Sequence, residues 1–226
     1  MIKAIIFDLD GTLIPFTLNV NTCRAEIIKY LMTQDFPKSL FSMKETAFDM
    51  LVRIKKYLIT QGNKDKNLET IEKKLFSIVE SYELKAAKET AIFQGTIETL
   101  TTLREMNLKI ALCTISGEKA TNYILNRFNL ESYFDAVIPR ESVSAVKPNP
   151  IHLEAVLKAL DVKSYESVLI GDSVKDVYAA LHLKVLTVGM TTGISTKEEL
   201  ICAGAHYLAS SITEIPILIT QLNKSL

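Results

Sequence analysis

Five short apolar segments, separated by stretches with helical periodicity, constrain the fold of this chain more than any other feature. They are Ile2–Phe7, Ile110–Cys113, Ala136–Ile138, Val168–Ile170 and Val185–Val188. Short, nearly continuous apolar runs are typical of strands buried on both faces of a parallel sheet. The helical patterns between the later runs cover Thr96–Met106, Lys119–Phe128, Pro150–Leu160 and Lys175–His182. This alternation predicts βαβ units, and therefore an α/β fold built on a doubly wound parallel sheet.

Residues 16–91 interrupt this alternation. Apolar residues recur at helical spacing within Met43–Leu58 and again within Leu68–Tyr82, and an earlier helix is expected over Thr22–Met32. The polar stretch Gln61–Asn67 predicts a loop between the last two helices. A helical segment of this length exceeds an ordinary crossover. We expect an inserted all-helical domain at 16–91, with linkers near Pro15 and Gly95, and a core formed by residues 1–15 and 92–226.

Composition excludes several classes of protein. Of the 226 residues, 48% are hydrophobic, which is enough for a substantial core and argues against disorder. The 26 basic residues balance the 26 acidic ones, so no overall positive charge favours nucleic acid. No apolar run approaches the roughly 18 residues of a membrane span, and none has the form of a signal peptide. We therefore expect a cytoplasmic protein without nucleic-acid or membrane partners.

Cysteine and histidine residues give no sign of a metal or disulfide framework. The cysteines are odd in number, widely separated and not near a histidine at metal-binding spacing. They are Cys23, Cys113 and Cys202, and we expect three reduced thiols. The dispersed histidines are expected to be structural; they are His152, His182 and His206.

Polar residues that could act in catalysis or ligand binding lie after four of the predicted strands, or before the helices that follow them. Ligands in open α/β sheets bind beyond the carboxyl ends of the strands, so these positions are favoured for a site. Each motif alone has a plain structural interpretation, since Asp-Gly turns, helix-capping Thr and solvated Lys are common. The motifs are Asp8-Leu9-Asp10-Gly11-Thr12, Thr114 with Ser116, Lys147 before Pro148, and Asp172 with Asp176.

Taken together, these motifs predict a phosphoryl-transfer site. Several carboxylates in one crevice repel each other unless a cation lies between them, and oxygen ligands suit Mg²⁺. A lysine and hydroxyl groups beside such an ion suit a bound phosphoryl group, since backbone N–H groups at a helix N-terminus also favour anions.

These motifs, in this order, resemble those of the haloacid dehalogenase superfamily of phosphohydrolases, and the resemblance covers essentially the whole chain. It implies a Rossmann-like core, and the helical insertion is similar to the family's C1-type cap. It also implies that Asp8 is the nucleophile and forms an aspartyl-phosphate, while Asp10 acts as general acid and then general base. Family members that cleave carbon–halogen bonds lack this second Asp, so phosphoryl transfer is favoured.

The resemblance further implies roles for the other motif residues. Thr114 and Lys147 would bind phosphoryl oxygens, as would Ser116 in the loop that follows Thr114. Mg²⁺ would be held by the side chains of Asp8 and Asp172 and by the backbone carbonyl of Asp10, with Asp176 orienting these ligands or joining them.

Two departures from the family pattern affect substrate choice. Ile14-Pro15-Phe16 replaces an acidic or small polar pair, and Ile115 stands where Asn often follows the Thr. The sequence therefore leaves open which small phosphorylated metabolite is the substrate, and it leaves the oligomeric state unknown.

Three functions remain open at this stage. A Mg²⁺-dependent phosphatase acting on a small phosphomonoester is favoured over a phosphomutase with the same aspartyl-phosphate, and over a regulatory module that binds a phosphorylated ligand without turnover. Leaving-group recognition is expected in the helical insertion, where the candidates are Phe16, Arg24, Arg53, Lys55 and Lys56.

Overall fold

The computed structural model describes residues 1–62 and 68–225. The chain forms two compact units, one made of Met1–Thr17 with Ala87–Leu226 and the other of Leu18–Ala86. The sequence analysis placed the boundaries of the insertion at residues 16 and 91. In the structure Phe16 and Thr17 belong to the first unit, as do residues 87–91 at the other end.

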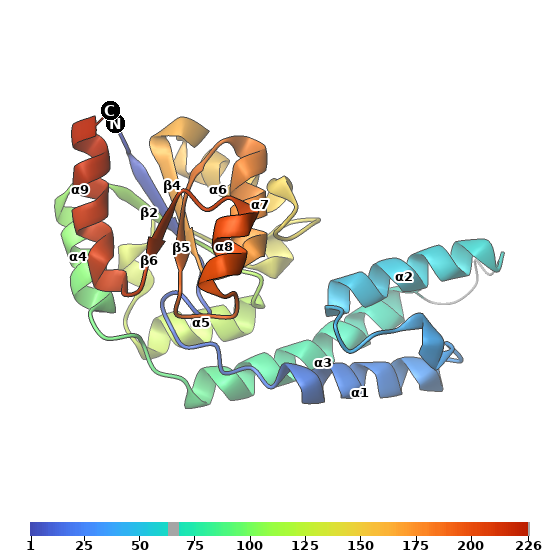
Figure 1. Cartoon of the computed structure of the whole chain (residues 1–226). Helices are drawn as coiled ribbons and strands as arrows, with labels where there is room; N and C mark the ends of the chain where they lie inside the picture. Colours follow the sequence, from blue (N-terminus) through green and yellow to red (C-terminus); the bar gives the residue numbers. More distant parts are fainter. Residues whose placement is uncertain (63–67, 226) are drawn as a thin grey trace. The chain divides into compact units, whose positions relative to one another are not determined.

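A six-stranded parallel sheet forms the centre of the first unit (Figure 1). Its strands are β1 (Ala4–Phe7), β2 (Lys109–Cys113), β3 (Ala136–Ile138), β4 (Ser167–Gly171), β5 (Leu186–Met190) and β6 (Tyr207–Ala209). Their order across the sheet is β3-β2-β1-β4-β5-β6. This arrangement confirms the predicted Rossmann-like, doubly wound α/β core.

The central strand β1 shows why the apolar runs become strands. All four of its residues are buried, and they pair with β2 on one side and β4 on the other, with Ile5 opposite both Ile110 and Val168. Strand β6 was not predicted. It is a three-residue edge strand in which Tyr207 is exposed, so it lacks the apolar run that marks a strand with two covered faces.

Helices cover both faces of the sheet. They are α4 (Thr96–Glu105), α5 (Glu118–Arg127), α6 (Pro150–Leu160), α7 (Val174–Leu183), α8 (Lys197–Ala203) and α9 (Ile215–Ser225). Helices α6 and α7 pack on one face, where Leu153 and Ala180 join Ile6 and Leu169 in one apolar cluster. Helices α4 and α9 lie against each other on the opposite face (Figure 1). Short 3₁₀ turns occur at Glu131–Tyr133, Arg140–Ser142, Ser164–Glu166 and Ile212–Glu214.

The second unit is helical. It contains α1 (Val20–Thr33), a 3₁₀ turn at Lys38–Leu40, α2 (Ala47–Thr60) and most of α3 (Leu68–Glu89), which ends seven residues beyond the last residue of the predicted stripe. The predicted apolar stripes meet in one core, which includes Ile27, Leu31, Met50, Ile54 and Leu75. The predicted loop Gln61–Asn67 begins with a turn at Gln61 and Gly62, and its residues 63–67 lie outside the described part of the chain.

The sheet order places the chemistry-bearing motifs. Chain connections run outward in opposite directions from β1 and β4, and such a reversal leaves a crevice at the carboxyl ends of the strands. Asp8 follows β1, Thr114 follows β2 and Asp172 follows β4, so three adjacent strands deliver polar side chains to the same edge.

Candidate active site

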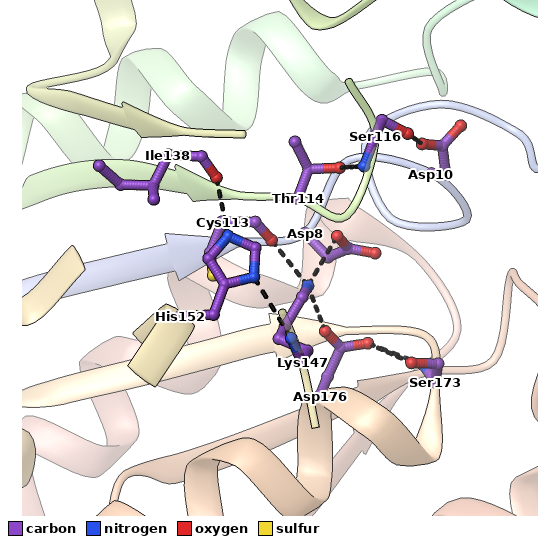
Figure 2. A network of polar contacts seen from close by, with 10 residues as sticks. All are labelled: Asp8, Asp10, Cys113, Thr114, Ser116, Ile138, Lys147, His152, Ser173 and Asp176. Carbon is purple, nitrogen blue, oxygen red and sulfur yellow. Dashed lines mark hydrogen bonds and ion pairs between the residues drawn. The ribbon is translucent and has the colours of Figure 1, made fainter. Parts of the chain in front are cut away.

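Lys147 joins two carboxylates at the carboxyl edge of the sheet. Its ammonium nitrogen Nζ lies 2.8 Å from Asp8 Oδ1 and 2.5 Å from Asp176 Oδ1, and it also donates to the carbonyl of Cys113 at 2.7 Å. Figure 2 shows these side chains pointing toward one another from separate elements. All three charged residues are buried. The structure thus brings together three of the predicted site residues in one ion-pair network.

Burial and the neighbouring charges shift the pKa values of Asp8 and Lys147 in this network. Burial raises the pKa of Asp8 well above its ordinary value, and the neighbouring carboxylates of Asp176 and Asp172 raise it further, while the Lys147 ammonium opposes the shift. Burial would lower the pKa of Lys147, yet the carboxylates of Asp176 and Asp8 outweigh it and raise that pKa. The lysine is therefore held in its charged form between the two aspartates.

Asp172 completes an acidic group around this network. Carboxylate oxygens of Asp8, Asp172 and Asp176 all lie within 4.8 Å of one another, and all three residues are buried. Burial, followed by repulsion from Asp176, raises the pKa of Asp172 to about 6. Three carboxylates against one ammonium leave the group net negative, so its charge and its oxygen donors fit a divalent cation.

Asp176 is the most constrained of the three carboxylates. Its Oδ1 accepts from Lys147, and its Oδ2 accepts from the backbone N–H and the hydroxyl of Ser173, at 3.1 and 2.7 Å. Ser173 precedes the first residue of α7, and Asp176 lies in the first turn. These bonds orient Lys147 and leave a lone pair of the carboxylate unused, so the place of Asp176 among the metal ligands stays a prediction.

Asp10 lies in a separate polar contact beside the two hydroxyl residues. Ser116 Oγ donates to Asp10 Oδ2 at 2.6 Å, and the Ser116 backbone N–H donates to Thr114 Oγ1 at 3.1 Å (Figure 2). Thr114 is fully buried. Since its oxygen accepts in that bond, its O–H hydrogen can donate to another group. The Ser116 hydroxyl thus contacts Asp10, and the expected contact of Ser116 with the substrate stays a prediction.

The loop after β1 turns sharply at Gly11. Its φ of 77° lies in the left-handed region that favours glycine, and its N–H donates to the carbonyl of Ile14 at 2.6 Å. Both aspartates of the first motif precede this turn, and they face different partners, since Asp8 contacts Lys147 and Asp10 contacts Ser116. The sequence Asp-x-Asp-Gly thus delivers two carboxylates to two different contacts.

Comparisons with known proteins identify the family. The family model described as haloacid dehalogenase-like hydrolase matches residues 5–190. The chain belongs to this family. Its curated relatives include the pyrophosphatase PpaX of Halalkalibacterium halodurans, 29% identical over 186 residues with 82% of both chains covered. They also include a phosphoglycolate phosphatase of Nitrosospira multiformis, 28% identical over 180 residues, covering 79% of this chain and 78% of the relative.

Solved structures agree on the fold. The crystal structure of a hydrolase from Pseudomonas syringae superimposes with a TM-score of 0.72 and 24% identity, covering 98% of both chains. The prediction of a haloacid dehalogenase-like enzyme of the phosphoric monoester hydrolase type is confirmed at the level of this family. Within the described residues, no helix is both long and apolar enough to cross a membrane.

His152 is a residue of this haloacid dehalogenase-like site that sequence reasoning treated only as structural. Its Nδ1 accepts from the Lys147 backbone N–H at 3.4 Å, and its Nε2 lies 3.0 Å from the carbonyl of Ile138 (Figure 2). An acceptor at Nδ1 and a donor at Nε2 define the neutral Nε2–H tautomer. Burial, followed by the charge of Lys147, lowers the pKa of His152 to about 4. The sequence feature that could have identified His152 as a neighbour of Lys147 is its position five residues later, in the first turn of α6.

Three of the four basic candidates in the insertion are engaged within their own unit. Arg24 donates to the carbonyl of Met43 at 2.9 Å, Arg53 forms an ion pair with Glu45, and Lys55 lies 3.5 Å from Glu72. Lys56 is exposed and forms no ion pair with another of the residues that the structure describes. Phe16 is 37% exposed within the first unit. Recognition of the leaving group by these residues stays a prediction.

Proposed function

We propose that this chain is a Mg²⁺-dependent phosphatase that hydrolyses a small soluble phosphomonoester through an aspartyl-phosphate. The observation that carries the proposal is the buried contact between Lys147 and Asp8 at the end of β1. An ammonium that holds a carboxylate in place beside a group of further carboxylates fits a nucleophile awaiting a cation and a phosphoryl group. The phosphatase names of the relatives support the same reaction.

In the first half-reaction an oxygen of Asp8 attacks phosphorus, and the bond from phosphorus to the leaving oxygen breaks in line. Lys147, bonded to Asp8 Oδ1, fixes the carboxylate and offsets charge on the transferring group. Asp10 gives its proton to the leaving oxygen, which departs as an alcohol. The products of this step are the aspartyl-phosphate at Asp8 and an ionised Asp10.

In the second half-reaction water attacks phosphorus, Asp10 takes a proton from that water, and the bond between Asp8 and phosphorus breaks. The enzyme returns to its starting protonation state, with Asp8 ionised and Asp10 protonated, and inorganic phosphate is released. The Ser116 hydroxyl, 2.6 Å from Asp10 Oδ2, positions the carboxyl group for both proton transfers. The O–H of Thr114 is the donor we assign to a phosphoryl oxygen.

A Mg²⁺ ion would be held by carboxylate oxygens of Asp8 and Asp172 and by the backbone carbonyl of Asp10, with Asp176 orienting Lys147 beside them. When bound, it would supply positive charge to the phosphoryl oxygens and lower the repulsion between them and the attacking carboxylate. The raised pKa values of Asp8 and Asp172 support the assignment, because buried carboxylates need a nearby cation to ionise.

The helical unit at 18–86 is proposed to act as the cap that selects the leaving group. The residues assigned so far, among them Lys147 and Thr114, bind only the transferring phosphoryl group. We further propose that the enzyme acts in the cytoplasm on a phosphorylated metabolite. The free thiols of its three cysteines accord with a reducing compartment; they are Cys23, Cys113 and Cys202.

The decisive experiment measures phosphate released by the purified chain with Mg²⁺ and a panel of phosphorylated metabolites. The panel includes phosphoglycolate, sugar monophosphates and inorganic pyrophosphate, because relatives carry the names of enzymes for the first and the last. We expect turnover of at least one monoester and none by Asp8→Asn. A sugar phosphate that is isomerised without phosphate release would indicate a phosphomutase instead, and binding without any turnover would indicate a regulatory module.

A further inference from the structure

The loop between β5 and α8, residues 191–195, contacts two of the motif loops that form the site. None of its residues belongs to the motifs identified in the sequence. It lies between the end of β5 at Met190 and the start of α8 at Lys197. Its contacts with the residues after β1 and after β4 are made by both backbone and side-chain atoms.

The first contact fixes the carboxylate of Asp172. The Ile194 backbone N–H donates to Asp172 Oδ2 at 2.7 Å, and the Ser195 N–H donates to the Asp172 carbonyl at 3.3 Å. Ser195 Oγ in turn accepts from the Val174 N–H at 3.1 Å. One oxygen of Asp172 is thereby held by the loop, which orients the carboxylate and leaves the other oxygen for a second partner.

The second contact ties the same loop to the first motif. Thr192 Oγ1 donates to the carbonyl of Gly11 at 2.6 Å. Gly11 follows Asp10, whose backbone carbonyl is one of the proposed metal ligands. The loop therefore bonds, through Thr192 and Ile194, to both segments that would surround the cation.

Gly193 lies between these two contacts, and there is no room for a side chain on it. A Cβ built at Gly193 would lie 1.8 Å from Asp172 Oδ2 and 2.4 Å from Asp172 Cβ. The φ of Gly193 lies outside the left-handed region, so space rather than backbone conformation requires the glycine. Gly11 also approaches this carboxylate closely, since a Cβ on Gly11 would lie 2.3 Å from the same Oδ2.

We propose that Gly193 and the Ile194 N–H are positioning groups that fix the orientation of the Asp172 carboxylate and thereby set the affinity of the site for Mg²⁺. The inference rests on the metal site of the proposed function. Hydrogen bonds that orient a metal ligand commonly change metal affinity by about 10- to 100-fold when they are lost. A side chain at residue 193 would push the carboxylate away from the Ile194 N–H without removing the ligand itself.

The test compares Gly193→Ala with Gly189→Ala. Gly189 lies in β5 and also has no left-handed φ, and the atoms nearest to a Cβ there belong to the apolar side chains of Leu208 and Leu200, at 3.0 to 3.3 Å. The measurement is the Kd for Mg²⁺ alone by calorimetry, together with the thermal unfolding midpoint in chelator. We expect Gly193→Ala to raise the Kd about tenfold or more, with a midpoint in chelator close to that of Gly189→Ala, whose Kd should stay near the wild-type value.

Equal Kd values for the wild type and Gly193→Ala would overturn the inference while leaving the proposed function intact. A wild type that binds no Mg²⁺ would overturn both, and the phosphate-release assay in chelator would show whether turnover persists without metal. If Gly193→Ala does not fold, Thr192→Val decides, because loss of its bond to the Gly11 carbonyl releases the loop that carries Gly193 and Ile194. Its control is Thr191→Val, since the Thr191 hydroxyl donates to the carbonyl of Ala209 instead. We expect a raised Kd for Thr192→Val alone, and an unchanged Kd would contradict the proposal.

Discussion

Lys147 Nζ lies 2.8 Å from Asp8 Oδ1, although the two residues are 139 positions apart in the chain. The contact is buried at both ends, and side-chain exposure is 2% for the lysine and 9% for the aspartate. Forming a buried ion pair of this kind costs desolvation free energy, and removing one of its two partners destabilises the fold strongly, because the other charge is then left buried without a partner. Its placement at the end of the central strand indicates that it serves chemistry, since burying the same volume with apolar side chains would stabilise the fold at least as well.

Asp8→Asn tests the nucleophile. An amide is nearly isosteric with the carboxylate but cannot form the acyl phosphate, so kcat should fall by about 10³-fold or more. The measurement is phosphate release in Mg²⁺ with the best substrate from the panel. Circular dichroism should show an unchanged fold, and a kcat within tenfold of the wild type would rule out Asp8 as the nucleophile.

Lys147→Met tests the cation of the network. The variant leaves Asp8 and Asp176 facing each other without their shared ammonium, and loss of one partner from a buried ion pair typically costs about 3–5 kcal/mol of the free energy of unfolding. Urea unfolding measures this loss. The matched control is Lys3→Met, because Lys3 is exposed and its ion pair with Glu166 lies at the surface end of the lysine, so its loss should change stability little. Similar results for both variants would contradict the network as drawn.

Removal of metal should abolish turnover. With carboxylates of Asp8 and Asp172 as ligands, activity should disappear in excess chelator and return with Mg²⁺. Ca²⁺ is larger and accepts looser geometry, so it should restore activity poorly. The assay follows phosphate release during titration of each ion into the chelated enzyme. Full activity in chelator would exclude the metal mechanism.

His152 should make stability depend on pH. Its pKa is lowered to about 4 in the folded chain from an ordinary value near 6.5, so between these values the unfolded state binds more protons than the folded state. The free energy of unfolding should therefore rise with pH across this window, by at most about 3 kcal/mol from this residue. The loss of stability caused by the lowered pKa of His152 is complete below pH 4 and absent above pH 6.5.

The matched variant for this prediction is His152→Gln, whose amide can still donate to the Ile138 carbonyl but does not titrate in this range. Urea unfolding in chelator at several pH values gives the difference between the two proteins. The raised pKa values of Asp8 and Asp172 act in the opposite direction, but both proteins share those groups. Parallel stability curves between pH 4 and 6.5 would show that His152 does not carry the effect.

The sequence analysis found the elements because their signals are local. The continuous burial of Ala4–Phe7 and the helical periodicity of Pro150–Leu160 depend on neighbouring residues, and both elements occur as expected. The exposed edge strand at Tyr207–Ala209 was missed, because a strand with an open side needs no apolar run. The extension of α3 to Glu89 was also missed, since the predicted apolar stripe ended at Tyr82.

The motifs at the strand ends were likewise identified from sequence, because parallel strands must present their carboxyl ends at one edge of the sheet. Which atoms meet there was decided only by the tertiary structure. Ser116 lies on Asp10, His152 holds the backbone of Lys147, and Gly193 leaves room for the Asp172 carboxylate. The first and third of these contacts join residues distant in the chain, and the geometry of all three depends on how α6, α7 and the β5–α8 loop pack around the sheet. The amino-acid sequence by itself determined the chemical groups and the edge to which they belong, and close packing determined their partners and orientations.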